Sequence, residues 1–256
     1  MSVLQDLIVK FNSKKNAELY TRIIKEIQSA EKIWTAFSDA SNNYYLGNVN
    51  GSATAYLFSE KDFFDIFYVH EKQKGYDVRS AENPAEYRMA LLADLYRSGF
   101  ETIIIDSGQT YLKMSLFDII KKPQEQTDNK DTRLIVNPSL VRTACWFFQE
   151  NAKEPANEEM WKLLFTEIFK AEYIVPADTR NLKIDGVKSG KIKLGKNSEV
   201  SFPVLQNSEG KSYYPFFTDW NELRKYDMNS NYSVLAANFK AVSYTHLRAH
   251  ETRHDL

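Results

Sequence analysis

Residues that commonly catalyse reactions or bind metals are few in this chain. It has four histidines and one cysteine among 256 residues. Three of the histidines, His246, His250 and His254, recur every four residues near the C-terminus, a spacing that would align them on one helix face. Imidazoles so placed could bind a metal ion, but only where a folded scaffold orients the rings. The surrounding residues show no helix or strand period, so we predict neither a metal site nor a cofactor.

The other histidine and the cysteine have no partner at a spacing that suggests catalysis. Hydrolytic triads need a base beside the nucleophile. His70 comes late in an expected helix, where an imidazole suits the negative end of the helix dipole. Cys145 shares a helix face with Val141 and Phe148, so we expect a buried thiol with a raised pKa and poor nucleophilicity. We therefore predict no catalytic residue; the alternative is an enzyme whose carboxylate and tyrosine acid–base groups meet only in the fold.

The segment Gly190–Asn197, GKIKLGKN, nearly matches a phosphate-binding loop. The motif needs Ser or Thr at its last position to ligate magnesium, and this chain has Asn197 there. The alternation of lysine with Ile192 and Leu194 also indicates a strand rather than a loop. No aromatic residue that could stack on bases separates these lysines. We expect a solvated basic hairpin and no nucleic-acid binding, with contact to a polyanion or an acidic partner as the alternative.

Composition excludes several classes of protein. Lys and Arg total 33 and Asp and Glu total 34, so no net charge draws the chain to nucleic acid or anionic membranes. The 43% hydrophobic and 14% aromatic content excludes a mainly disordered chain. No run approaches the roughly 20 apolar residues of a membrane span, and one cysteine cannot form an intramolecular disulfide. We find no secretory signal and expect a cytoplasmic protein without membrane contact.

Two segments of the chain resemble each other. Asn16–Ala36 and Asn157–Ala177 align without gaps and are identical at eight of 21 positions. Their apolar residues share one helical pattern, and each helix is followed by a short expected strand. Ser59 and Thr218 then follow aromatic strands, and each is predicted to cap the next helix. This similarity predicts an α+β fold in which two small units of mixed sheet and helix are repeated.

The first unit has a segment that the second lacks. Asn83 with Pro84 is predicted to begin a helix that ends at Gly99. The residues that follow, Glu101–Asp106, are expected to form a buried strand inside the sheet. We therefore expect a degenerate unit at residues 1–122, a polar linker at 123–132, and a truncated unit at 133–241 that ends in an unpaired strand.

The last fifteen residues are interpreted as foreign to the fold. Val242–Thr252 resembles the translation of a sequencing-library adapter over eleven consecutive residues. We expect residues 242–256 to form a non-native tail that packs against nothing, and the natural chain to continue differently after about Ala241.

The stretch Trp161–Tyr226 resembles the N-terminal domain of the SseB (enhanced serine sensitivity) family. The residues that carry this resemblance are Ala171–Ala177, AEYIVPA, a strand around Phe202–Val204, and Tyr214–Leu223, YPFFTDWNEL. The first unit has a degenerate copy of the same pattern. The resemblance implies an α+β bacterial cytoplasmic protein, and it assigns no reaction and no catalytic residue.

These observations favour a non-catalytic binding or interaction protein over an enzyme. The candidate interaction surface consists of Tyr213, Tyr214 and Trp220, although a place in the core is the competing interpretation for all three. Such a surface would fit a protein partner. The sequence leaves the partner and the oligomeric state open.

Overall fold

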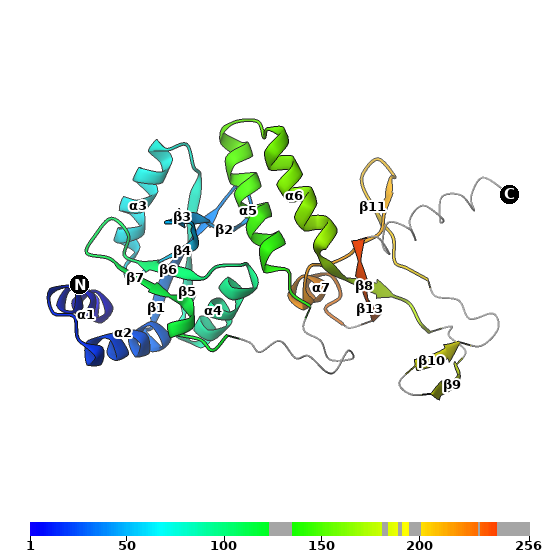
Figure 1. The fold of residues 1–256 in the computed structure, drawn as a ribbon, viewed down its shortest axis with the longest axis horizontal. Helices are drawn as coiled ribbons and strands as arrows, with labels where there is room; N and C mark the ends of the chain where they lie inside the picture. The colour runs from blue at the N-terminus through cyan, green and yellow to red at the C-terminus, as the bar shows by residue number, and fades with distance from the viewer. Residues whose placement is uncertain (123–134, 181–183, 189–190, 195–200, 230, 240–256) are drawn as a thin grey trace. The chain divides into compact units, whose positions relative to one another are not determined.

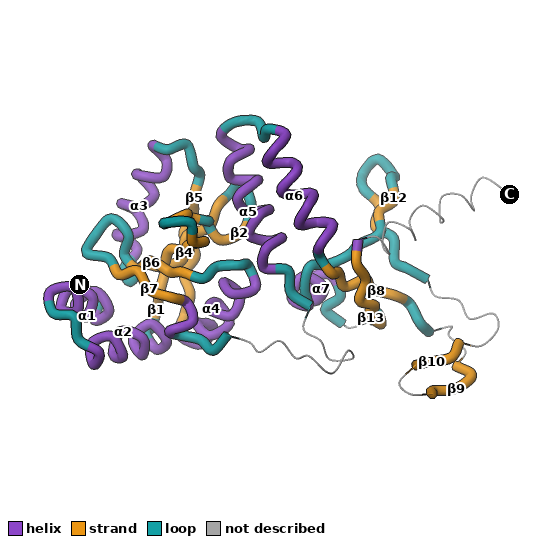
Figure 2. The backbone as a smooth tube through the Cα atoms, viewed as in Figure 1, coloured by secondary structure: helices purple, strands orange, loops and turns teal. Residues whose placement is uncertain are grey.

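The protein is an α+β fold in which helices and mixed sheets alternate along the chain (Figures 1 and 2). A computed structural model describes residues 1–122, 135–180, 184–188, 191–194, 201–229 and 231–239. These residues pack into two units, which are described separately. Unit 1 contains the described residues of Met1–Glu125 and Pro138–Glu167, and unit 2 contains those of Gln126–Asn137 and Ile168–Leu256.

Unit 1 contains most of the helices and one sheet of seven strands. Its helices are α1 (Val3–Ser13), α2 (Ala17–Ser29), α3 (Lys61–Gln73), α4 (Arg88–Arg97), α5 (Pro138–Lys153) and α6 (Glu158–Lys170), the last of which continues into unit 2. Its strands are β1 (Lys32–Ser38), β2 (Asn43–Tyr44), β3 (Gly47–Val49), β4 (Ser52–Phe58), β5 (Val78–Pro84), β6 (Thr102–Ile105) and β7 (Leu112–Ser115).

The sheet of unit 1 is mainly antiparallel with one parallel pair. Strand β1 pairs along its whole length with β5 on one side and with parts of β2 and β4 on the other. Strand β4 runs parallel to β6, which pairs antiparallel with β7. Thus β6 lies inside the sheet, as the sequence predicts, while β5 forms one of its edges.

Alternating side chains bury both faces of this sheet. In β4, Ala55 and Leu57 point into one apolar cluster, while Tyr56 and Phe58 belong to another. The first cluster takes its helical residues from α1, α2 and α4, and the second takes Phe64 and Phe67 from α3. The sheet is therefore covered by helices on both faces, which explains why its strands carry so few exposed residues.

Three predicted helix caps, those at Asn83, Ser59 and Thr218, are wrong. Strand β5 continues through Asn83 and Pro84 into a 3-10 turn, and α4 begins only at Arg88. The Asn83 side chain accepts a hydrogen bond from the Arg88 guanidinium, which also donates to the carbonyls of Ile27 and Ala30. Arg88 is fully buried, so its side chain closes the C-terminal end of α2 and leaves Asn83 no capping role.

The second wrong cap is Ser59. Glu60 occupies the N-cap position of α3, and its side chain makes no capping hydrogen bond. In unit 2 the corresponding Thr218 precedes Asp219, whose carboxylate caps α7 (Trp220–Tyr226) by accepting from two backbone amides. Thr218 is thus the third wrong cap, and both Ser59 and Thr218 lie one residue before the N-cap. By contrast, the predicted helix end at Gly99 is confirmed, because Gly99 adopts a φ of +85° directly after the C-cap of α4.

Helix α5 packs with unit 1. The Gln149 side chain accepts from the backbone N–H of Leu46 at 2.8 Å and donates to its carbonyl at 3.1 Å, as a neighbouring strand would. At the other end of α5, Gly99 lies so close to Pro138 that an added Cβ would be 2.3 Å from the Pro138 carbonyl oxygen. These contacts agree with the placement of α5 and most of α6 in unit 1.

Unit 2 is built around a pair of antiparallel strands. Apart from the end of α6, its described elements are β8 (Glu172–Ala177), β9 (Ile184–Lys188), β10 (Lys191–Leu194), β11 (Leu205–Gln206), β12 (Ser212–Tyr213), α7 (Trp220–Tyr226) and β13 (Ser233–Asn238). Strand β8 pairs with β13 on one side, and Ile174 bridges to Phe217 on the other. The core consists of Ile135, Ile174 and Leu223 with surrounding aromatic residues. The side chain of Asn137 makes hydrogen bonds to the backbone of Glu172 and to the carbonyl of Thr218. These bonds connect β8 to the residues just before α7.

The two units share one order of pairing. In unit 1, β1 follows α2 and pairs with β5 on one side and with β4 on the other. In unit 2, β8 follows α6 and pairs with β13 on one side and with Phe217 on the other. In this order β5 of unit 1 corresponds to β13 of unit 2. Because β6 pairs with β4 and not with β5, β5 is an edge strand even in the larger unit.

Among the described residues, no helix is both long and apolar enough to cross a bilayer. The predicted linker at 123–132 and the predicted tail at 242–256 lie outside the described residues. The expected domain limits and the expected truncation therefore remain predictions.

Candidate functional site

The fold brings a carboxylate and several tyrosines together inside unit 1. The Tyr45 hydroxyl donates to Glu71 of α3 at 2.5 Å, and both residues are buried. The rings of Tyr56 and Tyr76 pack 5.8 Å and 5.4 Å from the Tyr45 ring. Burial and the nearby Glu71 carboxylate raise the pKa of Tyr45 far above its usual value, and burial raises that of Tyr56 to about 12. Neither phenol can lose its proton near neutral pH, so neither is an effective base.

This cluster continues to α5 at the surface of unit 1. The Tyr76 hydroxyl donates to Glu150 at 2.6 Å and accepts from Lys153 at 2.7 Å. The Lys153 ammonium also lies 4.1 Å from the centre of the Tyr76 ring. Each polar atom here is bonded to a neighbour in the same cluster. We interpret the arrangement as the attachment of α5 to the residue pair that precedes β5.

A second buried acid lies where the parallel strands β4 and β6 end. Asp106 is fully buried and has a φ of +59°. Its carboxylate accepts from the Ser59 backbone N–H at 2.7 Å and from the Ser59 hydroxyl at 2.8 Å. Desolvation raises the pKa of Asp106 to about 6, and the two bonds from Ser59 oppose that rise. A serine that donates to a carboxylate resembles an activated nucleophile, but the fully buried carboxylate instead joins the ends of the two strands.

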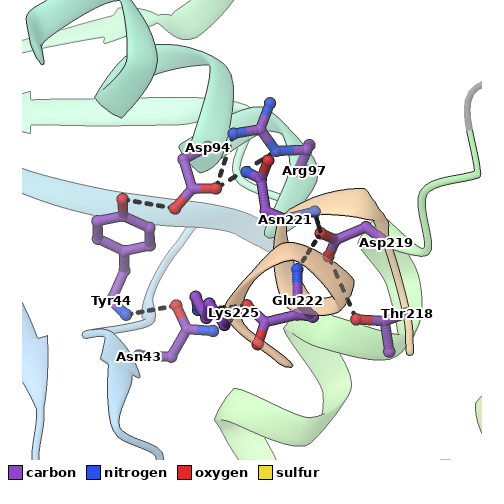
Figure 3. A network of polar contacts seen from close by, with 9 residues as sticks. All are labelled: Asn43, Tyr44, Asp94, Arg97, Thr218, Asp219, Asn221, Glu222 and Lys225. Atoms are coloured by element: carbon purple, nitrogen blue, oxygen red, sulfur yellow. Dashed lines mark hydrogen bonds and ion pairs between the residues drawn. The ribbon is translucent and has the colours of Figure 1, made fainter. Parts of the chain in front are cut away.

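Other polar contacts in each unit also serve local structure (Figure 3). In unit 1 the Tyr44 hydroxyl donates to Asp94 of α4 at 2.8 Å, and Arg97 pairs with the same carboxylate. In unit 2, Asp219 accepts from the backbone of Asn221 and Glu222 at the start of α7. The former contact holds strand β2 against α4, and the latter is a helix cap.

The structure shows where the two residues considered for catalysis, His70 and Cys145, are placed. His70 is exposed in the last turn of α3, as expected. Cys145 is 2% exposed, and burial raises its pKa to about 12, which confirms the prediction of a buried, weakly acidic thiol. Within the described ranges, no three His, Cys, Asp or Glu side chains are grouped as metal ligands. The described part of the near P-loop motif, Lys191–Leu194, is strand β10 and pairs with β9 as a hairpin.

The three residues of the predicted interaction surface differ in exposure. Tyr213 lies on β12 and is 52% exposed, directly opposite Leu205 of β11, which is also exposed. Tyr214 follows it and is half-buried. Trp220 begins α7 and packs against the core of unit 2. Only Tyr213 has the exposure expected of a surface contact, and whether it binds a partner stays a prediction.

A larger aromatic surface lies on α5 and α6 in unit 1. We call it the aromatic ladder; its members are Phe147, Phe148, Trp161 and Phe165. Phe147 is buried and contacts both Phe148 and Trp161, with ring centres 5.4 Å and 4.5 Å apart. Trp161 stacks on Phe165 at 5.7 Å. The three outer rings remain 44–48% exposed, which is unusual for adjacent large aromatic residues.

The sequence contained a sign of this surface. Helix α6 has apolar residues on most of its circumference, and such a helix is normally buried all round. In the structure only Leu164 of α6 is buried. The sequence pattern predicts one apolar helix face, and the spacing of its residues cannot reveal whether that face is covered by other elements.

One known family model matches the C-terminal part of the chain. The family model described as SseB protein N-terminal domain matches residues 150–252, less than half of the chain. The match supports a relation to the SseB family for this region, which contains α6 and the described elements of unit 2. It overlaps the expected tail at 242–256 and does not test its origin. No curated protein matches this chain.

Proposed function

We propose that this chain is a bacterial, cytoplasmic SseB-family protein that binds another protein and catalyses no reaction. The observation that carries the proposal is the aromatic ladder, whose outer rings are 44–48% exposed and contact one another. Aromatic side chains supply much of the binding energy at protein interfaces because they bury a large area with few rotatable bonds. Trp161 and Phe165 also lie in the region that matches the family model.

The polar clusters of unit 1 support binding over catalysis. The alternative, an enzyme with acid–base groups assembled by the fold, needs a carboxylate that can reach a substrate. Glu71 and Asp106 are instead buried, and each is engaged by a hydroxyl of the same unit. An apolar surface and internally bonded acids together suit a protein that recognises a partner by packing.

We also propose that the two units arose by duplication. The eight identities between Asn16–Ala36 and Asn157–Ala177 coincide with the same order of strand pairing around β1 and β8. The equivalent positions of Ser59 and Thr218 agree with this order. In this proposal the partner-binding surface belongs to the helices that precede the second unit.

Capture of partners from the source cells tests the binding proposal. The full chain with Trp161→Ser and Phe165→Ser should lose a partner that the unchanged chain retains. Tyr111→Ser is a matched control, because it removes a similarly exposed aromatic ring that belongs to neither candidate surface. Equal capture by all three proteins, with circular dichroism showing that all are folded, would contradict a role for the ladder.

A further inference from the structure

Strand β13 lies at the edge of its sheet because of the topology of the fold. Among the described residues, β8 is the one strand that pairs with β13. The corresponding strand of unit 1, β5, is also an edge strand, even though that unit has further elements after it. An edge strand presents backbone N–H and C=O groups that another strand can bind.

The hydrogen bonds of β8 determine which residues of β13 present these groups. Ile174 donates to and accepts from Phe217 at 2.9 Å, so its backbone groups point away from β13. Since backbone groups alternate in direction along a strand, those of Val175 point toward β13, where Val175 pairs with Leu235. Leu235 therefore bonds to β8, and the backbone groups of Val234 and Ala236 point to the outer edge.

The two edge strands differ in how they are protected. Strand β5 carries Arg79 and Glu82, which form ion pairs with Asp39 and Lys32, and it ends at Pro84. Charges and proline are common means by which proteins prevent an edge from pairing with another chain. Strand β13, SVLAAN, has no charge and no proline, and Leu235 is 44% exposed. The edge of unit 2 therefore lacks the protection present in unit 1.

We propose that the outer edge of β13 pairs antiparallel with β13 of a second copy of this chain. In the register centred on Leu235, Val234 of one copy lies opposite Ala236 of the other, and their outward backbone groups bond reciprocally. The two Leu235 side chains then face each other as a pair that is not hydrogen-bonded. A large residue meets a small one at the flanking positions, and no like charges meet. The strand is thus complementary to itself.

This inference uses a different part of the chain from the aromatic ladder, so either can fail alone. A cysteine at the centre of the register tests it directly. Residues opposite each other without hydrogen bonds have Cα atoms about 4.5 Å apart, a separation that a disulfide can bridge. In the full chain, Leu235→Cys should form a disulfide-linked dimer under mild oxidation. Leu205→Cys is the control, because Leu205 is also 44% exposed in unit 2, and the native Cys145 is buried in both proteins.

We expect Leu235→Cys to cross-link at least about tenfold faster than Leu205→Cys at equal concentration. Adding Ala236→Pro, which removes an outward N–H and leaves the bonds to β8, should abolish that difference. Ala236→Lys serves the same purpose if circular dichroism shows that the proline variant is unfolded. Equal cross-linking rates for the two cysteines, or a fast rate that survives both edge substitutions, would overturn the proposal. Pairing of β13 with another segment or another protein would also overturn the proposal, because the Leu235→Cys chain would then remain a monomer.

Discussion

Replacing Asp106 by asparagine should change how the stability of unit 1 depends on pH. Asparagine has nearly the shape of aspartate and tolerates the φ of +59° found at this position. Its carbonyl can accept from the Ser59 backbone N–H, and its amide can donate to the Ser59 hydroxyl. The substitution therefore keeps the connection between β4 and β6 and removes only the group that titrates.

The size of the effect follows from the raised pKa of the buried Asp106 carboxyl. Its pKa is raised from 3.8 to about 6 in the folded protein. Because the folded value lies above the unfolded one, Asp106 contributes stability fully at pH values below about 4 and loses it as the pH rises through about 6. Each pKa unit corresponds to about 1.4 kcal/mol, so between about pH 4.5 and pH 7.5 the contribution falls by about 2 kcal/mol.

Urea unfolding of the wild type and Asp106→Asn at both pH values measures this effect. Tryptophan fluorescence is a suitable probe because three of the four tryptophans, Trp34, Trp146 and Trp161, belong to unit 1. The variant should gain about 2 kcal/mol relative to the wild type on going from the lower to the higher pH. Asp118→Asn, which removes an exposed carboxylate bonded to Tyr20, should show no comparable gain. A difference that is unchanged between the two pH values, or that shifts the opposite way, would refute the reasoning.

Three further results are expected from single sites. Arg88→Met should lower the free energy of unfolding by about 2–4 kcal/mol in urea titrations, because the buried carbonyls of Ile27 and Ala30 lose their donor; a loss below about 1 kcal/mol would contradict that role. Gly99→Ala should lower the melting temperature in calorimetry, since its Cβ would collide with Pro138; an unchanged melting temperature would argue against this close contact. Cys145 should react with a thiol reagent only after unfolding in urea, and rapid labelling of the native protein would disprove its burial.

Local signals in the sequence predicted many of the elements. The helix and short strand expected within Asn16–Ala36 are α2 and β1, and Gly99 follows the end of α4 as predicted. The consecutive β-branched residues before Asp106 form the fully buried strand β6. These features depend on neighbouring residues in the chain, which is why pattern and spacing are enough to find them.

Features that depend on distant contacts were not predicted. Ser59 has the chemistry of a cap, but Asp106, 47 residues away, binds its hydroxyl instead. Likewise Asn83 bonds Arg88, whose guanidinium reaches the end of α2. The partner of Ser59 is distant in the chain, and the nearby partner of Asn83 is held in place by distant carbonyls, so in both cases a long-range contact overrides the local role.

The candidate site shows the same limit. Tyr213 and Trp220 are both aromatic residues near a turn, yet one is exposed and the other packs in the core of unit 2. The aromatic ladder was hidden in a periodic pattern that fits a buried helix equally well. Sequence periodicity identifies which side of a helix is apolar, and only the packing shows whether that side is covered.

The central claim, that the aromatic ladder is a partner-binding surface, can be tested most directly by cross-linking inside the source cells. A photo-reactive phenylalanine analogue at Phe165 would report what lies within contact of the ladder, and the same analogue at Tyr68 of α3, which is 37% exposed, would serve as the control. We predict a discrete protein adduct from position 165 that is missing from position 68. Identical adduct patterns at the two positions, or no adduct at position 165 while the protein remains folded, would contradict the claim.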